Sequence, residues 1–167
     1  TEVHVGAAIG FPLGQTTVNS KLYEAKNAII DGADEIDYVI NVGEAKMHNW
    51  SYIEEEMKEM TSLCHSNSII VKVIFENCYL EESEIIELSR IAKEVEPDFI
   101  KTSTGFGTRG ATIEDIKLMK QHVGDIVQVK AAGGIRDLQT CLAMIDAGAT
   151  RIGTSSSVEI INELMSK

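Results

Sequence analysis

Four charged residues interrupt runs of apolar residues that otherwise have the character of buried β-strands: Asp37, Lys72, Lys101 and Lys130. Charged side chains are uncommon in such strands and need a partner or a purpose. A lysine beside another ammonium group, in a site partly shielded from water, has its pKa lowered. The neutral amine is then a nucleophile toward carbonyl groups at neutral pH. These residues therefore indicate Schiff-base chemistry.

Three of the four stand at equivalent positions of an internal repeat. The repeat contains a helix stop, two turn residues and an apolar strand, and it covers segments 32–37, 96–101 and 148–153. It aligns Asp37 with Lys101 and Gly153. Lys130 sits equivalently in its own strand. In a barrel such residues converge on one mouth. A single lysine on a strand can also pair at the strand end or reach water, and Lys72 is equally well interpreted as a counter-ion of Asp37.

Two loops rich in glycine and hydroxyl residues follow the last two predicted strands. Gly133 and Gly134 lie in the first loop, and Ser155 and Ser156 lie in the second, where the last helix opens. Glycines let backbone N–H groups approach an anion, and a helix N-terminus favours negative charge. Each loop taken alone is equally well a turn or a cap. Together they predict a phosphate site, because the last two βα-loops of TIM barrels commonly bind phosphate.

Other motifs carry no chemistry in this interpretation. Segment 105–110 reads G-x-G-x-x-G, but a dinucleotide site needs an acidic residue about 20 positions later, and Lys130 stands there instead. The histidines show no ligand spacing and the cysteines form no C-x-x-C pair; they are His4, His48, His65, His122, Cys64, Cys78 and Cys141. We therefore expect no metal and no redox motif.

The chain alternates strand and helix patterns six times. The spacing predicts strands over 3–11, 36–42, 68–75, 99–103, 126–131 and 151–154. It predicts helices over 18–32, 49–64, 85–95, 112–123, 137–148 and 158–165, with Asn49, Thr112 and Asp137 as caps. No linker divides the chain, so one α/β domain over 1–167 is expected. Units of about 29 residues favour a TIM (β/α)8-type barrel. A doubly wound parallel sheet is the alternative.

The amino-acid composition limits the classes of molecule that the protein is expected to bind. The chain has 44% hydrophobic residues, 25% charged residues and a net charge of -11, which excludes a disordered chain and disfavours nucleic acid and anionic membranes. A small anionic substrate needs a local basic site. Neither a signal peptide nor a span of about 18 apolar residues is seen. Three widely spaced cysteines fit a reducing compartment, so we expect a cytoplasmic protein.

Segments 99–105 (FIKTSTG) and 129–136 (VKAAGGIR) closely resemble the deoxyribose-phosphate aldolases, and segments 9–14, 32–37 and 148–155 agree in order. The resemblance implies a class I aldolase on a TIM barrel. Such an enzyme reversibly cleaves 2-deoxyribose 5-phosphate to acetaldehyde and glyceraldehyde 3-phosphate, without metal or organic cofactor. A small phosphorylated sugar is then the substrate, and homo-oligomers are compatible with this interpretation.

The same resemblance assigns roles. It implies that Lys101 forms the Schiff base, that Lys130 is the neighbouring cation that activates it, and that Asp37 is the acid/base carboxylate. It also implies that Thr104 contacts the substrate. The phosphate is expected on Gly133, Gly134, Ser155 and Ser156.

The sequence also departs from the family pattern. It matches only the third to eighth βα units of an eight-stranded barrel, and the tyrosine that some members carry in a C-terminal tail is absent from 162–167. We therefore expect an N-terminally incomplete barrel in which Thr1 is not the natural start. Two alternatives stay open: another phosphosugar enzyme on this barrel, such as an epimerase or isomerase, and an inactive or partner-dependent fragment of an aldolase.

Overall fold

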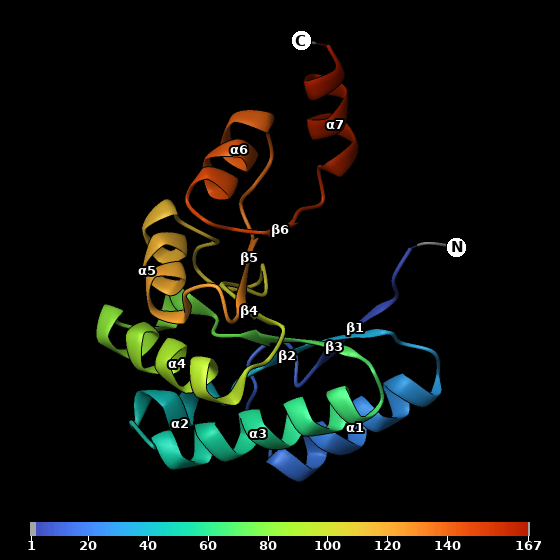
Figure 1. Ribbon diagram of the computed structural model, residues 1–167, viewed down its shortest axis with the longest axis vertical. Helices are drawn as coiled ribbons and strands as arrows, with labels where there is room; N and C mark the ends of the chain where they lie inside the picture. Colours follow the sequence, from blue (N-terminus) through green and yellow to red (C-terminus); the bar gives the residue numbers. More distant parts are fainter. Residues whose placement is uncertain (1–2, 167) are drawn as a thin grey trace.

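A computed structural model describes residues 3–166 as a curled, six-stranded parallel sheet with helices along its outer side (Figure 1). The strands are β1 (Gly6–Ile9), β2 (Glu35–Val39), β3 (Ile70–Ile74), β4 (Phe99–Lys101), β5 (Gln128–Ala132) and β6 (Arg151–Gly153). The helices are α1 (Val18–Ile30), α2 (Val42–Lys46), α3 (Trp50–Ser66), the short 3-10 helix η1 (Asn77–Tyr79), α4 (Glu82–Val95), α5 (Ile113–Val123), α6 (Leu138–Asp146) and α7 (Ser157–Met165).

The strand order decides between the two predicted folds. The strands pair in chain order from β1 to β6, and every pair is parallel. A doubly wound sheet reverses its strand order at a switch point, and no reversal occurs among the described strands. The doubly wound alternative is therefore wrong, and the barrel-type fold is right.

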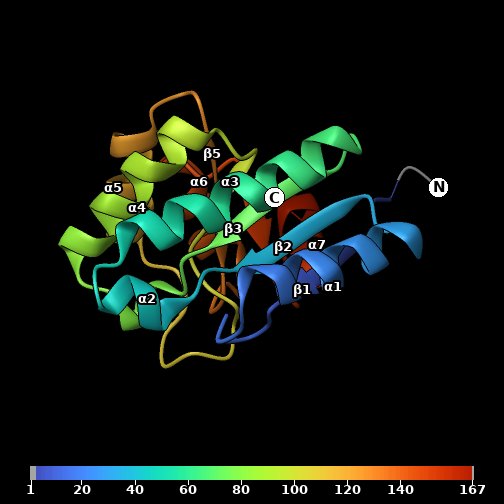
Figure 2. The same ribbon diagram turned by 90° about the horizontal axis from the view of Figure 1, so that it is seen from below.

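The helices cover one face of the sheet and leave the other for polar residues. Figure 2 shows α1 and α3 lying along β1–β3, and Figure 1 shows α4 to α6 continuing on the same outer side. Ile36 and Val71 are fully buried in the core that these helices share with the sheet. At the far end of the sheet, α7 leaves apolar side chains exposed, as expected of an open sheet: Val158, Ile161, Leu164 and Met165. No helix within residues 3–166 is long and apolar enough to cross a bilayer.

Most predicted helix starts are correct. Thr112 accepts a hydrogen bond from the Asp115 N–H at 3.0 Å, and the Asp137 carboxylate accepts one from Thr140 N–H at 2.7 Å. Asn49 precedes α3 but its side chain makes no capping bond. It donates instead to Glu44 of α2 at 2.8 Å. Helix α2 itself was not expected, because the apolar run that ends at Val42 has the pattern of a single strand.

Candidate active site

Three side chains from separate strands meet on the inner face of the sheet. Asp37 of β2 accepts hydrogen bonds at its Oδ2 from the Nζ atoms of Lys101 on β4 and Lys130 on β5, each over 2.8 Å. Lys101 and Lys130 are 64 and 93 positions from Asp37 in sequence, and the curled sheet brings the three residues together. Asp37 and Lys101 are buried, at 9% and 8% exposure. The predicted catalytic group is therefore assembled in space.

A second charged group lies two residues earlier along β2. Glu35 accepts from Lys72 of β3 at 2.6 Å. One guanidinium nitrogen of Arg151 on β6, Nη1, donates to both Glu35 oxygens, at 2.8 and 2.7 Å. The Lys72 ammonium also contacts Oδ1 of Asp37 at 2.7 Å. Lys72 thus pairs with Asp37, as its interpretation as a counter-ion predicts. Because both carboxylates hold it, Lys72 fixes the orientation of Asp37.

The repeat-equivalent residues do not all stand at one level of the sheet. Lys101 lies directly beside Lys130 in the register. Asp37, however, is level with Lys72, and Lys101 is level with Ile74, two residues further along β3. The stagger expected of a barrel separates the levels, and long side chains bridge the offset. Gly153 is level with Ala132 rather than Lys130. A Cβ at Gly153 would lie 3.0 Å from the Ala132 Cβ and in van der Waals contact with Lys130 Cε, at 3.4 Å.

Burial and neighbouring charges shift the protonation of this group. Burial raises the pKa of Asp37, but the charges of Lys101, Lys130 and Lys72 outweigh it and hold that pKa well below its usual range. Burial lowers the pKa of Lys130, and the adjacent Lys101 ammonium lowers it further against the opposing attraction of Asp37. The arrangement therefore favours the ionised form of Asp37 and shifts Lys130 toward its neutral form.

A cavity of about 380 Å³ opens beside the two lysines. Most of the predicted site residues line it, namely Lys101, Thr104, Lys130, Gly133, Gly134 and Ser155. Ser156 is not among the lining residues. It stands at the N-cap position of α7, where its side chain makes no capping bond, and its backbone N–H donates to the Thr154 hydroxyl at 2.9 Å. Asp37 also lies outside the lining and contacts the cavity only through the two lysines.

Two lining residues were not singled out from the sequence. Arg136 is an exposed cation at the end of the loop that holds Gly133 and Gly134, and Thr154 lies at the start of the neighbouring loop. Both glycines adopt positive φ angles, +84° and +79°, which a side chain would strain. The available signal was a cation two residues after such a glycine pair, because a cation at that position can line the same cavity as the loop.

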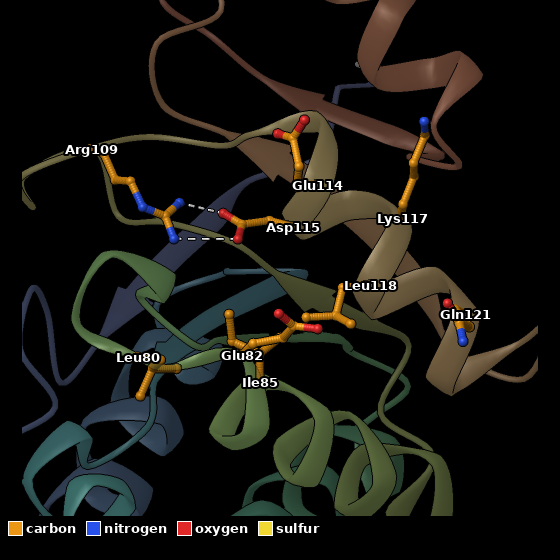
Figure 3. A pocket seen from close by; sticks show the side chains of 9 residues that line it. All are labelled: Leu80, Glu82, Ile85, Arg109, Glu114, Asp115, Lys117, Leu118 and Gln121. Atoms are coloured by element: carbon orange, nitrogen blue, oxygen red, sulfur yellow. Dashed lines mark hydrogen bonds and ion pairs between the residues drawn. The ribbon is translucent and has the colours of Figure 1, made fainter.

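A separate cavity of about 460 Å³ lies on the outer side, between α4 and α5 (Figure 3). In Figure 3, Arg109 faces Asp115 with two contacts, so the guanidinium is already neutralised. Lys101 and Lys130 do not line this cavity. The two predicted nucleophilic lysines therefore lie at the inner cavity and not at this one.

Comparison with known proteins identifies the family of the chain. The family model described as DeoC/LacD family aldolase matches residues 2–161. The deoxyribose-phosphate aldolase of Lactobacillus acidophilus is 58% identical over 98% of this chain and 69% of its own length. That of Bacteroides thetaiotaomicron is 54% identical over 95% of this chain and 67% of its own.

Solved structures show the same relationship. An aldolase called QR15 superposes with a TM-score of 0.93 and 44% identity, over 99% of this chain and 74% of its own. A deoxyribose phosphate aldolase from Aeropyrum pernix, described as tetrameric, gives a TM-score of 0.89 and 31% identity over 98% and 69%. The lysines, the carboxylate and the fold thus occur in a chain that belongs to the DeoC/LacD family of aldolases.

Proposed function

We propose that the protein reversibly cleaves 2-deoxyribose 5-phosphate to acetaldehyde and glyceraldehyde 3-phosphate, the reaction that the names of its relatives indicate. One observation carries the proposal: Lys101 and Lys130 share one carboxylate oxygen of Asp37 at the edge of a cavity lined by glycine loops. This arrangement has a nucleophile, a proton-transfer pair and an anion site in one place.

Lys101 is the residue that forms the covalent bond. Its amine attacks the aldehyde carbon of the open-chain sugar, and loss of water gives an iminium ion. The hydroxyl on the third carbon then loses its proton. The bond between the second and third carbons breaks, its electrons pass into the iminium, and glyceraldehyde 3-phosphate leaves. The enamine takes a proton at the second carbon, and water releases acetaldehyde and the free lysine.

Asp37 and Lys130 carry the protons in this scheme. Each is within hydrogen-bond distance of the other, and Asp37 also contacts the Lys101 nitrogen. A carboxylate and an amine with shifted pKa values, held 2.8 Å apart, exchange protons readily. Lys72 lies on the far oxygen of Asp37 and takes no part in the cavity lining.

The phosphate end of the substrate is placed over the loops that follow β5 and β6. Gly133 and Gly134 allow close backbone approach, and Ser155 offers a hydroxyl. Ser156 contributes through the N-terminus of α7, where it stands at the N-cap position. Arg136 adds a positive charge at the rim. This local basic site overcomes the net charge of -11 for an anionic sugar.

Reductive trapping tests the proposal. Incubation with acetaldehyde and borohydride, followed by peptide mapping, should add the two-carbon unit to the peptide that contains Lys101. The variant Lys101→Arg should abolish both labelling and turnover, since a guanidinium stays protonated. Lys58→Met, at an exposed lysine of α3 outside the site, serves as the matched lysine control for labelling. A label on Lys130 or Lys72 instead would overturn the assignment of Lys101, and absence of any cleavage by the protein would overturn the function.

A further inference from the structure

Glu76 holds an unusual position directly after β3. Its side chain is buried, at 1% exposure, and its backbone adopts the left-handed conformation, with φ +47° and ψ +59°. Left-handed residues other than glycine cost free energy and persist where surrounding contacts demand them. Within residues 3–166 no ion pair is found for this carboxylate. A strained, buried acid without a cation therefore needs another explanation.

The Glu76 carboxylate accepts one contact from its own segment, from the Cys78 thiol at 3.7 Å, and its other contacts lead to the loop that follows Lys101. Its Oε1 accepts a hydrogen bond from the Thr104 backbone N–H at 3.3 Å, and its Oε2 accepts one from the Thr104 hydroxyl. Gly107 of the same loop passes close by, so that a Cβ there would lie 3.1 Å from Glu76 Oε1. The Glu76 carboxylate thus forms hydrogen bonds with both the main chain and the side chain of Thr104.

The neighbouring segments are tied together in parallel. The Asn77 N–H donates to the Thr102 carbonyl at 2.8 Å, and Arg109 donates to the Asn77 carbonyl at 3.2 Å. The loop from 102 to 109 is therefore anchored at its start, at Thr104 and at its end. Glu76 supplies the middle anchor, which is the one that lies at the cavity.

The hydrogen bond to Glu76 also fixes the direction in which the Thr104 hydroxyl donates. A carboxylate only accepts, so the hydroxyl proton of Thr104 points at Glu76. The same hydroxyl oxygen accepts from the Phe106 N–H at 3.0 Å. What remains for the cavity is a lone pair. Thr104 can therefore accept a hydrogen bond from a substrate hydroxyl, but it cannot donate one.

We infer that Glu76 is a positioning residue that holds Thr104 as a dedicated acceptor for a hydroxyl group of the sugar chain. This inference rests on the proposed function, because it needs a hydroxylated substrate in the cavity. It explains why the strain at Glu76 is maintained. A bond from the substrate to Thr104 is made without any rearrangement of the loop.

Glu76→Gln is the discriminating variant. The Thr104 amide and hydroxyl donate to different oxygens of Glu76, and glutamine keeps an oxygen at only one of these two positions, with an NH2 group at the other. The hydroxyl then accepts from the new NH2 and turns its proton toward the cavity. We expect kcat/KM for 2-deoxyribose 5-phosphate to fall about ten- to a hundredfold. Borohydride trapping with acetaldehyde, which has no hydroxyl, should change by less than about twofold, because Lys101 is untouched.

Thr104 supplies the second half of the test. Thr104→Val should give a loss like that of Glu76→Gln, and Thr104→Ser, which keeps the hydroxyl, should restore most of the activity. The double variant Glu76→Gln/Thr104→Val should be no worse than either single one, because both remove the same contact. The exposed Glu82→Gln on α4 is the matched control. Additive losses, or an equal loss of acetaldehyde trapping, would overturn the inference and indicate a general effect on folding.

Amide hydrogen exchange tests the positioning role of Glu76 independently of the proposed function. The amides of Thr104 and Phe106 should exchange faster in Glu76→Gln than in the unmodified protein, and the control Glu82→Gln should leave them unchanged. This readout needs no turnover. If the unmodified protein does not cleave the sugar, the proposed function fails, and unchanged exchange in Glu76→Gln would independently refute the positioning role.

Discussion

Lys101 and Lys130 donate to one and the same atom, Oδ2 of Asp37, over 2.8 Å each. Two ammonium groups are therefore held within two hydrogen-bond lengths of each other. A third, Lys72, occupies the other oxygen of the carboxylate. One negative charge cannot balance three positive charges, and Glu35 offsets only part of the excess. The inner face thus favours a neutral amine and attracts an anion in a chain that is otherwise acidic.

Replacement of Asp37 should separate bond formation from proton transfer. In Asp37→Asn the lysines keep their places on the strands, but the carboxylate that exchanges protons is gone. We expect turnover to fall about a hundredfold or more, the range of general acid–base catalysis. Trapping of acetaldehyde on Lys101 should persist, as measured by intact mass after borohydride. Loss of trapping in parallel with turnover would mean that Asp37 acts on imine formation itself.

The same carboxylate should contribute stability that depends on pH. Because the pKa of Asp37 is held below its ordinary value of 3.8, its stabilising effect is fully present above that value and is lost as the pH falls through the lower folded-state value. Urea unfolding should therefore show Asp37→Asn to be less stable than the unmodified protein at pH 7. The difference in free energy of unfolding between the two proteins should become smaller below about pH 4. A difference that is constant from pH 7 to 3 would contradict the depressed pKa.

The phosphate site predicts a selective loss. Ser155→Asp places a carboxylate in the cavity, and Ser156→Asp places one at the cap of α7. Repulsion should weaken phosphorylated substrate strongly, with KM raised about tenfold or more, while unphosphorylated deoxyribose is affected little. Arg136→Met should have the same selectivity. Equal effects on both sugars would count against the site, and a larger effect of Ser155→Asp would identify the hydroxyl as the closer group.

Periodicity and residue type predicted most of what positions the catalytic group. The carboxyl ends of parallel strands lie on one edge, so charged residues at repeat-equivalent positions had to converge. The offset between Lys72 and Lys101 was not predictable, because the stagger between β3 and β4 depends on how the sheet curls. The short helix α2 was missed for a local reason, since its first residue, Val42, extends the apolar run of β2.

Contacts between distant residues account for the rest. Glu35 and Arg151 are 116 positions apart, and no local sequence pattern around either residue predicts their contact. Glu76 was missed because a glutamate has no preference for the left-handed conformation that it adopts. Its role depends on Thr104, 28 positions away. Such residues become visible only when the loops are placed.

A buried ion pair behind the site provides a last prediction. Lys21 of α1 is fully buried, and its Nζ donates to Glu56 of α3 at 2.6 Å and to the Val39 carbonyl at 2.7 Å. Burial lowers the pKa of Lys21, and burial raises that of Glu56, in each case against the attraction of the partner. Both charges depend on each other, and through Val39 they tie two helices to the strand that carries Asp37.

Replacement of Lys21 alone should therefore lower the free energy of unfolding far more than replacement of both Lys21 and Glu56. Lys21→Met leaves the Glu56 carboxylate buried without its cation and should lower the free energy of unfolding by about 3–5 kcal/mol. Lys21→Met/Glu56→Leu should recover most of that loss, since an apolar pair needs no solvation. Lys58→Met, which breaks the exposed pair with Glu54, is the matched control and should cost less than about 1 kcal/mol. Urea unfolding at pH 7 measures the stability of all three variants.

The single variant Lys21→Met should also regain stability toward pH 4.5, because a buried carboxyl with a raised pKa is favoured when protonated. A double variant as unstable as Lys21→Met would show that the site needs the ion pair itself, not merely its charge balance.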